Sequence, residues 1–237
     1  MTDLTQQTLA SLVSANHQVV PVLEKYHLDF CCKGKRTLAE ACAEKGLKIE
    51  SITEELISLA ALSNKQPMSL TGMSAEQLVS YILVHHHFYI KQSMPTIIAH
   101  LDKVATKHGE RYPYMKKVYD LFVIIVWEML LHMEKEETIL FPRIREAENL
   151  FANGLASQVV PGYISKPIST MEADHEEAGD ILNEIRVLTN NYTPPPDACI
   201  TFKVTLAELK AFEEDLHRHV HLENNILFPK AIQYESK

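Results

Sequence analysis

Apolar residues recur every three to four positions along four long segments in the last two thirds of the chain, as they do in amphipathic helices. The segments cover about 74–107, the stretch from a break at 108–114 to about 141, 168–189 and 199–228. The stretch LFVIIVW, 121–127, looks locally like a strand because β-branched residues dominate it, but the helical spacing that follows overrules that interpretation. Two short turns and one longer connection between the segments predict a four-helix bundle.

The first part of the chain has a different pattern, with short helical stretches only. Residues 63–73 mix Pro, Gly and polar residues, as linkers do. Ser74 opens a Ser-Ala-Glu-Gln capping box that should start the first long helix, and Pro95 should kink that helix or shift its start. We therefore expect an all-α protein with a small helical domain over 1–62, a linker over 63–73 and a bundle over 74–237.

One motif occurs twice: HMEKEETILFP at 132–142 returns as HVHLENNILFP at 219–229. Residues four apart on a helix share a face, so each His-x3-Glu aims two side chains in the same direction. Each copy also follows another histidine by about 44 residues, the length of a helical hairpin. The two copies supply His87, His132 and Glu136 in the first half and His175, His219 and Glu223 in the second. Two packed hairpins would bring these six side chains into one core.

Four imidazoles and two carboxylates, with no cysteine in the bundle core, suit divalent ions that favour imidazole. Glu136 and Glu223 lie where carboxylates could bridge two ions. With two histidines for each ion, a six-coordinate iron keeps room for an oxo or hydroxo bridge and for a diatomic ligand or water. Ferritin-type di-iron bundles use Glu-x-x-His instead, and the His-Glu-x-x-His of helical zinc proteases is absent from the sequence. We expect two non-haem iron ions, bridged by oxo or hydroxo.

Neighbouring residues could support these side chains. Glu128 and Asp215 each lie four residues before a histidine of a pair, and Asp174 precedes His175, so these carboxylates could accept the second imidazole N–H. Ordinary charged helix surfaces are the alternative. His108 should lie roughly 30 Å along its helix from His87, outside the site. The remaining bundle histidines close to the motifs should face elsewhere, as surface or supporting residues: His85, His86, His217 and His221.

Cys31 and Cys32 lie just ahead of Thr37, which opens a helix with a capping box. The positive end of that helix and the basic residues at 33, 35 and 36 should lower a thiol pKa. Adjacent cysteines rarely form an unstrained disulfide, so transient metal or nitrosyl ligation, or redox chemistry, fits the pair better. Burial as two small hydrophobic residues is the alternative. Cys42 and Cys199 are expected to be structural.

Charge and composition exclude some classes of binding partner. The formal net charge of −8 disfavours nucleic acids and anionic membranes. The N-terminus lacks the basic start and apolar stretch of a signal peptide, and no uncharged apolar run approaches the ~20 residues of a membrane span. Four cysteines are too few for a disulfide scaffold. We expect a cytoplasmic protein without nucleic-acid or membrane partners.

Several motifs carry a resemblance to hemerythrin-like domains. EADHEEAG at 172–179 and TPPPDAC at 193–199 occur in order with the two His-x3-Glu motifs, and LDFCCKGKRTL precedes them all. From residue 1 to its end the chain resembles the RIC (repair of iron centres) family, in which an N-terminal Asp-aromatic-Cys-Cys-Gly-Gly domain precedes a histidine-rich bundle. The resemblance implies the same six metal ligands, and repair of iron-sulfur clusters damaged by nitric oxide or peroxide. At Lys33 the chain departs from the first glycine of that motif.

Under this hypothesis, iron is held in a labile form and passed to damaged iron-sulfur proteins, with Cys31 and Cys32 as candidate transfer or redox thiols. Two alternatives remain open: a hemerythrin that binds or senses oxygen or nitric oxide, and an enzyme that reduces nitric oxide at the di-iron centre. A homodimer, in which the small domain packs on a neighbouring bundle, is also compatible with the sequence.

Overall fold

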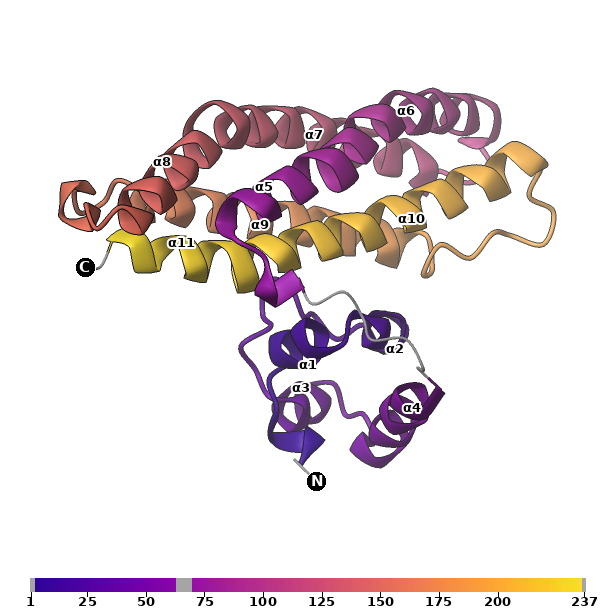
Figure 1. Ribbon diagram of the computed structural model, residues 1–237. Helices are drawn as coiled ribbons and strands as arrows, with labels where there is room; N and C mark the ends of the chain where they lie inside the picture. Colours follow the sequence, from indigo (N-terminus) through magenta and orange to yellow (C-terminus); the bar gives the residue numbers. More distant parts are fainter. Residues whose placement is uncertain (1–2, 63–69, 236–237) are drawn as a thin grey trace.

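The computed structural model describes residues 3–62 and 70–235, and these residues form helices joined by turns (Figure 1). No strand occurs within those two ranges, where a single antiparallel bridge joins Thr8 to Thr37. The expected all-α class is confirmed. Most of the expected linker, 63–69, lies outside the described residues.

Short helices make up the N-terminal part: η1 (Leu4–Gln6), α1 (Leu9–Ala15), η2 (His17–Val19), α2 (Val20–Lys25), α3 (Leu38–Glu44) and α4 (Ile49–Leu62). The starts of α1 and α3 are tied together, because Leu9 N–H donates to the Arg36 carbonyl and Leu38 N–H donates to the Gln7 carbonyl, each at 2.9 Å. Thr37 forms the expected capping box with Glu40. The segment between α2 and α3 carries both cysteines of the pair. Its C-terminal end is therefore held next to the start of α1 by backbone hydrogen bonds.

Four long rods form the bundle. In chain order they are α5 (Ala75–Ile82), η4 (Leu83–His87) and α6 (Phe88–His108); α7 (Tyr114–Lys135), η5 (Glu136–Leu140) and α8 (Phe141–Ala152); α9 (Ser165–Leu188); and α10 (Ile200–Leu222), η7 (Glu223–Leu227) and α11 (Phe228–Glu235). The short 3-10 turn η6 (Ala156–Gln158) lies between α8 and α9. In the bundle α6 packs against α7 and α10, and α7 packs against α9 (Figure 1). The capping box at Ser74 is present, and α6 continues through Pro95.

Three rods contain a π-helical turn: η4, η5 and η7. In η5 and η7 the cause is visible in the repeated Leu-Phe-Pro. A proline cannot donate to the carbonyl four residues back, and its ring collides with that carbonyl, so a wider turn just before it relieves both problems. The backbone N–H of Phe141 donates to the Glu136 carbonyl, and that of Phe228 donates to the Glu223 carbonyl, each five residues back. Such turns are frequent at functional sites.

The π turns also extend the rods. We expected helices two and four to end near Phe141 and Phe228, and both ends were wrong. The rods continue to Ala152 and Glu235 because Pro142 and Pro229 fall in the first turn of a new α-helical segment, where a missing N–H is tolerated.

Two apolar cores fill the molecule. One extends from the N-terminal helices into the bundle between α6, α7, α9 and α10, and the other fills the opposite end around α5, α8 and α11. The predicted polar residues lie near the boundary between the two cores. His87, for example, lies between Ile82 of one core and Ile90 of the other. The fold thus encloses a polar layer between two apolar ones.

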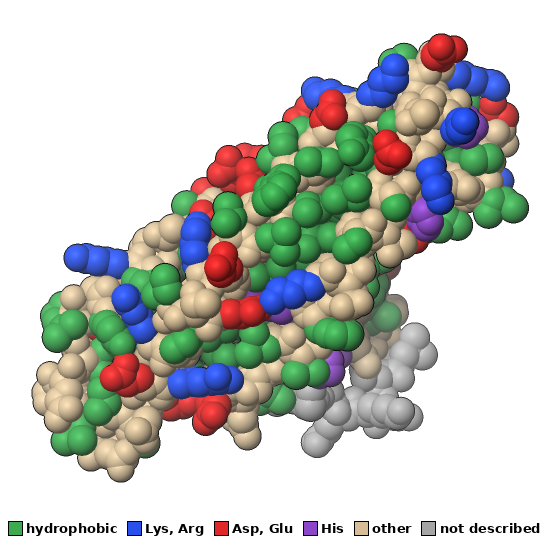
Figure 2. Space-filling view, turned by 90° about the horizontal axis from the view of Figure 1, so that it is seen from above, with side chains coloured by type: hydrophobic (Ala, Val, Ile, Leu, Met, Phe, Trp, Pro, Cys, Tyr) green, Lys and Arg blue, Asp and Glu red, His purple; other side chains and the backbone are tan. Residues whose placement is uncertain are grey.

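The N-terminal part packs below the bundle in Figure 1, so Figure 2 views the far side of the bundle. Figure 2 shows apolar side chains gathered on this face. On α6, α7 and the π turn η4, the exposed large hydrophobic residues are Val84, Phe88, Ile124, Trp127, Leu130 and Leu131. Within the described part of the chain, no helix combines the length and apolarity needed to span a bilayer.

Candidate metal centre

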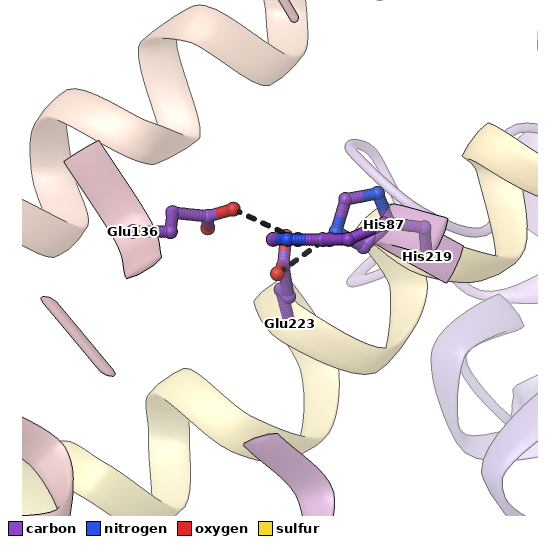
Figure 3. A group of neighbouring side chains, drawn as sticks. All are labelled: His87, Glu136, His219 and Glu223. Atoms are coloured by element: carbon purple, nitrogen blue, oxygen red, sulfur yellow. Dashed lines mark hydrogen bonds and ion pairs between the residues drawn. The ribbon is translucent and has the colours of Figure 1, made fainter. Parts of the chain in front are cut away.

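The six side chains selected by the repeat lie together in two groups, in each of which the ligand atoms are within 4.8 Å of one another. One group is His87, Glu136, His219 and Glu223; the other is His132, Glu136, His175 and Glu223. Figure 3 shows the first group, with both carboxylates directed toward the two imidazoles. Each group takes one histidine from each hairpin, and the two glutamates belong to both groups.

The glutamates lie between the groups. Glu136 Oε2 is 3.3 Å from Nε2 of His87 and 3.3 Å from Nε2 of His132. Glu223 is placed in the same way in the second hairpin, 3.2 Å from Nε2 of His175 and 2.9 Å from Nε2 of His219. Both carboxylates are 0% exposed. Two buried carboxylates that each contact histidines of both groups are placed to bridge two cations.

Unpartnered atoms show that this cluster is not an ordinary hydrogen-bonded network. Both carboxylate oxygens of Glu136, Glu223 Oε2 and His87 Nε2 are buried without a hydrogen bond among the described residues, despite the short ion-pair distances. Nε2 of His132 faces Nε2 of His175 at 3.1 Å, where at most one of the two can donate. Buried polar atoms are normally satisfied. Lone pairs that converge in this way fit cations, and the nitrogen-rich donor set fits iron among other divalent ions.

The outer imidazole nitrogens of the first hairpin are held by carboxylates. His87 Nδ1 donates to Glu137 at 2.8 Å, and Lys91 contacts the same carboxylate at 2.7 Å. His132 Nδ1 donates to Asp174 at 3.3 Å, and Lys135 pairs with that carboxylate at 3.0 Å. Carboxylates at this position orient the ring and make a metal-binding imidazole more basic.

In the second hairpin, no carboxylate that the structure describes binds the outer nitrogens of the two clustered histidines. His175 Nδ1 donates to the neutral amide oxygen of Asn224 at 2.9 Å. His219 Nδ1 is buried and has no hydrogen-bond partner among the described residues, and His86 stacks on its ring at 5.7 Å between centroids. The supporting residues Glu137 and Asn224 were missed in the sequence. Both follow the shared glutamate of their motif, so the repeat itself held the signal.

Two of the expected supports bind other residues. Asp174 contacts His132 rather than its neighbour His175, and Asp215 accepts from His86 Nδ1 at 3.1 Å rather than from His219. Oε2 of Glu128 is buried and has no hydrogen-bond partner in the part of the chain that the structure describes, and burial together with Glu177 and Asp174 raises the pKa of this carboxyl. Sequence proximity on one helix therefore selected the right residue types but the wrong partners.

Imidazole basicity follows the difference between the hairpins. Burial lowers the pKa of His132, but Glu136 and Asp174 outweigh it and raise the pKa to about 10. The pKa of His87 is also raised, because Glu136 overcomes the effect of burial. Burial alone dominates at His219 and lowers its pKa. Burial would raise the pKa of Glu223, yet its histidine neighbours hold it well below the usual range.

The other histidines lie outside both groups. His85 is exposed and packs on the Tyr81 ring, whereas His217 Nδ1 donates to Glu24 at 2.7 Å. His221 Nδ1 lies 3.3 Å from the Phe30 carbonyl oxygen. His108 lies at the far end of α6, 3.3 Å from the Cys199 thiol. His217 and His221 thus fasten the N-terminal part to α10.

Asp29 organises the turn that carries the cysteine pair. Its Oδ1 accepts the backbone N–H groups of residues 31, 32 and 33 at 3.1, 3.0 and 3.3 Å. From the bundle side, Asn225 Nδ2 donates to the Cys31 carbonyl at 3.0 Å, and the Cys32 thiol lies 3.8 Å from the His175 carbonyl oxygen. The π turn η7 therefore directs three successive side chains to different targets: Glu223 to the cluster, Asn224 to His175 and Asn225 to the cysteine turn.

Comparison with known proteins agrees with both parts of this architecture. Residues 78–231 match the family model described as "Hemerythrin HHE cation binding domain", and residues 5–60 match a "Domain of Unknown function (DUF542)". The chain is 36% identical, over 97% of its own length and 98% of theirs, to proteins named iron-sulfur cluster repair protein YtfE from Escherichia coli, Shigella boydii and Citrobacter koseri. The chain belongs to the RIC family. Its hemerythrin domain is a cation-binding domain, and the six clustered residues are its candidate ligands.

The departure from the RIC motif at Lys33 is accommodated. Lys33 is not among the described residues with left-handed backbone, so this position does not require glycine. The next residue does: a Cβ on Gly34 would lie 2.3 Å from the Phe30 carbonyl oxygen. The lysine therefore leaves the turn geometry intact.

The expectation of a lowered thiol pKa was wrong for Cys31. The adjacent Cys32 thiol, burial and the Asp29 carboxylate together raise the pKa of Cys31 well above its usual value. Asp29 Oδ1 lies 3.3 Å from the Cys31 sulfur, so this carboxylate adds to the effect of the adjacent thiol and of burial. In this RIC protein all four cysteines are free thiols.

Proposed function

We propose that this protein repairs damaged iron-sulfur clusters by supplying iron from a pair of ions held in the bundle. One observation carries the proposal: two buried His-Glu groups share both glutamates and lie beside a free cysteine pair. Relatives that align over nearly the whole chain are named iron-sulfur cluster repair proteins, which supports the same role here.

The proposed ligands divide evenly. His87 and His219 would hold one iron, His132 and His175 the other, and the two glutamates would bridge both. Iron held in this way supplies exchangeable ions and leaves room for the expected oxo or hydroxo bridge and for a small diatomic ligand. Protein ligands that are mostly neutral imidazoles favour release over permanent storage, because two carboxylates do not neutralise two ferrous ions.

The N-terminal cysteines would receive the iron. Cys32 is close to the backbone of His175, whose side chain is a proposed ligand, so an ion leaving that group meets a thiol next. Asp29 and Asn225 fix the turn, which keeps both thiols at that exit. The division into a small domain, a linker over 63–73 and a bundle belongs to the same proposal.

The experiment mixes the iron-loaded protein with an apo iron-sulfur protein and sulfide, in the presence of a chelator that scavenges free iron. We expect the client's cluster absorption to return. A Cys31→Ser, Cys32→Ser double variant should keep its iron and deliver it several-fold more slowly, whereas the matched Cys42→Ser, Cys199→Ser variant should match the wild type. No cluster formation with fully loaded wild-type protein would contradict the proposal.

Other expectations stay predictions. Headspace nitrous oxide would reveal reduction of nitric oxide at the same centre, and an optical titration would reveal reversible diatomic binding. Homodimer formation is testable by light scattering. In this structure the N-terminal part packs on its own bundle, whereas in the expected homodimer it would pack on the bundle of a second copy. A cytoplasmic location belongs to the same proposal.

A further inference from the structure

A third group of metal-ligating atoms lies in the N-terminal part, outside the bundle cluster. Asp29, Cys31 and Cys32 each offer one ligand atom, and these atoms lie within 4.8 Å of one another. We infer that these three residues form a separate site for a thiophilic divalent ion, through which iron passes between the bundle and a client. The binding site stands on its own geometry, whereas its transit role rests on the proposed repair function.

The spacing of the atoms matches tetrahedral thiolate coordination. Two sulfurs bonded at about 2.3 Å to one tetrahedral ion lie roughly 3.8 Å apart, and an oxygen bonded at about 2.0 Å lies roughly 3.5 Å from either sulfur. The two cysteine sulfurs are 3.8 Å apart, and Asp29 Oδ1 is 3.3 Å from the Cys31 sulfur. Both distances are within about 0.2 Å of those that a single tetrahedral ion requires.

The backbone that carries these ligands is held from both sides. Three N–H groups bind Asp29 Oδ1, and Asn225 Nδ2 donates to the carbonyls of Phe30 and Cys31 at 3.3 and 3.0 Å. Cys31 is 5% exposed, so its sulfur has little freedom to turn away. A site fixed in this way loses little conformational entropy when an ion binds.

Space and charge on the bundle side also suit a cation in transit. A pocket of about 180 Å³ opens at the two thiols and is lined by Lys35, Glu172, Glu176, Asn224 and Asn225. The carboxylates of Glu172 and Glu176 come from α9, on either side of His175. They line the same pocket as the two thiols and would attract a cation that approaches from the cluster.

Binding here is an exchange of protons for metal, without oxidation or reduction. Each thiol gives up its S–H proton to solvent and forms one metal–sulfur bond, so one divalent ion releases two protons. The Cys32 thiol would then no longer donate to the His175 carbonyl. A metal ion at the thiol site would therefore remove this contact with the backbone of His175, whose side chain belongs to the second group of the cluster.

The test uses full-length protein whose bundle has first been loaded with iron, and cobalt(II) as the probe. Thiolate ligands give cobalt an intense sulfur-to-metal charge-transfer absorption that histidine and carboxylate ligands do not give. We expect this band to saturate at one cobalt per chain. Cys31→Ser or Cys32→Ser should abolish it, and Asp29→Asn, which can still accept the turn hydrogen bonds, should weaken cobalt binding about tenfold or more. Cys42→Ser and Cys199→Ser are the matched controls and should leave the band unchanged.

A second measurement needs no variant, so a misfolded mutant cannot obscure the result. Cobalt should slow alkylation of Cys31 and Cys32 in the wild-type protein, mapped by mass spectrometry, and leave the exposed Cys199 reactive. Absence of the band, or equal alkylation with and without cobalt, would overturn the site. If the band forms as expected but no client is repaired, the proposed repair function fails while the metal site stands.

Discussion

The two helical hairpins carry the same His and His-x3-Glu pattern but support it differently. In the first, carboxylates hold His87 and His132, and the pKa of each imidazole is raised. In the second, a neutral amide holds His175, and His219 Nδ1 has no hydrogen-bond partner in the described ranges. Each candidate ion would therefore have one histidine ligand that a carboxylate supports, from the first hairpin, and one without such support, from the second. The loosely supported hairpin is the one that contacts the N-terminal cysteines, so under the proposed function iron would be released and received on the same side.

Removing a shared glutamate should have the largest effect, because it takes a ligand from both ions at once. Glu136→Gln should lose most of the bound iron. Its iron affinity should fall by more than the 10- to 100-fold that is typical when an outer supporting group is removed. Glu134→Gln, at an exposed position two residues earlier on the same rod, should keep the wild-type content. Iron analysis after desalting measures both, and equal iron in the two variants would contradict a shared ligand.

Exchanging the supports should reverse the asymmetry between the hairpins. Glu137→Gln removes the carboxylate behind His87 and should weaken iron binding about 10- to 100-fold. Asn224→Asp gives His175 the carboxylate that the first hairpin already uses, and should slow iron release to a chelator. Chelator competition follows both. If Asn224→Asp released iron faster than the wild type, the link between support and lability would be wrong.

Gly34→Ala tests whether the joint between the N-terminal part and the second hairpin depends on close packing. The new Cβ would displace the Phe30 carbonyl, to which Asn225 donates, and overpacking of this kind costs about 1–3 kcal/mol. Gly179→Ala on α9, where a Cβ meets nothing within 4 Å, should be stabilising by about 0.5–1 kcal/mol. Denaturant unfolding of both variants measures the difference, and an unchanged Gly34→Ala protein would exclude a tight joint.

The pH dependence of the metal-free protein should separate the hairpins by sign. The pKa of His132 rises from 6.5 to about 10 on folding, so its stabilising charge is fully present below pH 6.5 and is lost as the pH rises through 10. The pKa of His219 falls on folding, so the stability linked to its neutral form is present above pH 6.5 and is lost as the pH falls through the lowered value. Imidazole NMR titrations should show His132 charged and His219 neutral near neutral pH. The opposite order would contradict the comparison.

Much of this arrangement was predictable because it depends on local spacing. Helical periodicity gave the four rods, and the i, i+4 rule with the repeat length selected the six residues that the structure brings together. Capping residues fixed the starts of α3 and α5. The role of the six repeat residues as metal ligands stays a prediction, but their convergence is a property of the fold.

The sequence did not predict which histidine each supporting carboxylate binds, because that depends on the register between neighbouring helices. Asp174 and Asp215 lie close to histidines along the chain, yet each supports one on another rod, because the register between packed helices decides which nitrogen a carboxylate reaches. The thiol pKa at Cys31 was misjudged because the adjacent Cys32 thiol, burial and the Asp29 carboxylate all raise it, and the sequence alone does not show that they surround the thiol. The π turns η5 and η7 follow from Leu-Phe-Pro, a local signal that a simple helical wheel ignores.

Anomalous diffraction at the iron absorption edge from crystals of the iron-loaded protein tests the central claim most directly. The account predicts two peaks in the buried layer, one between His87 and His219 and one between His132 and His175, with Glu136 and Glu223 contacting both. A single peak, or peaks at the protein surface with these glutamates unligated, would contradict it.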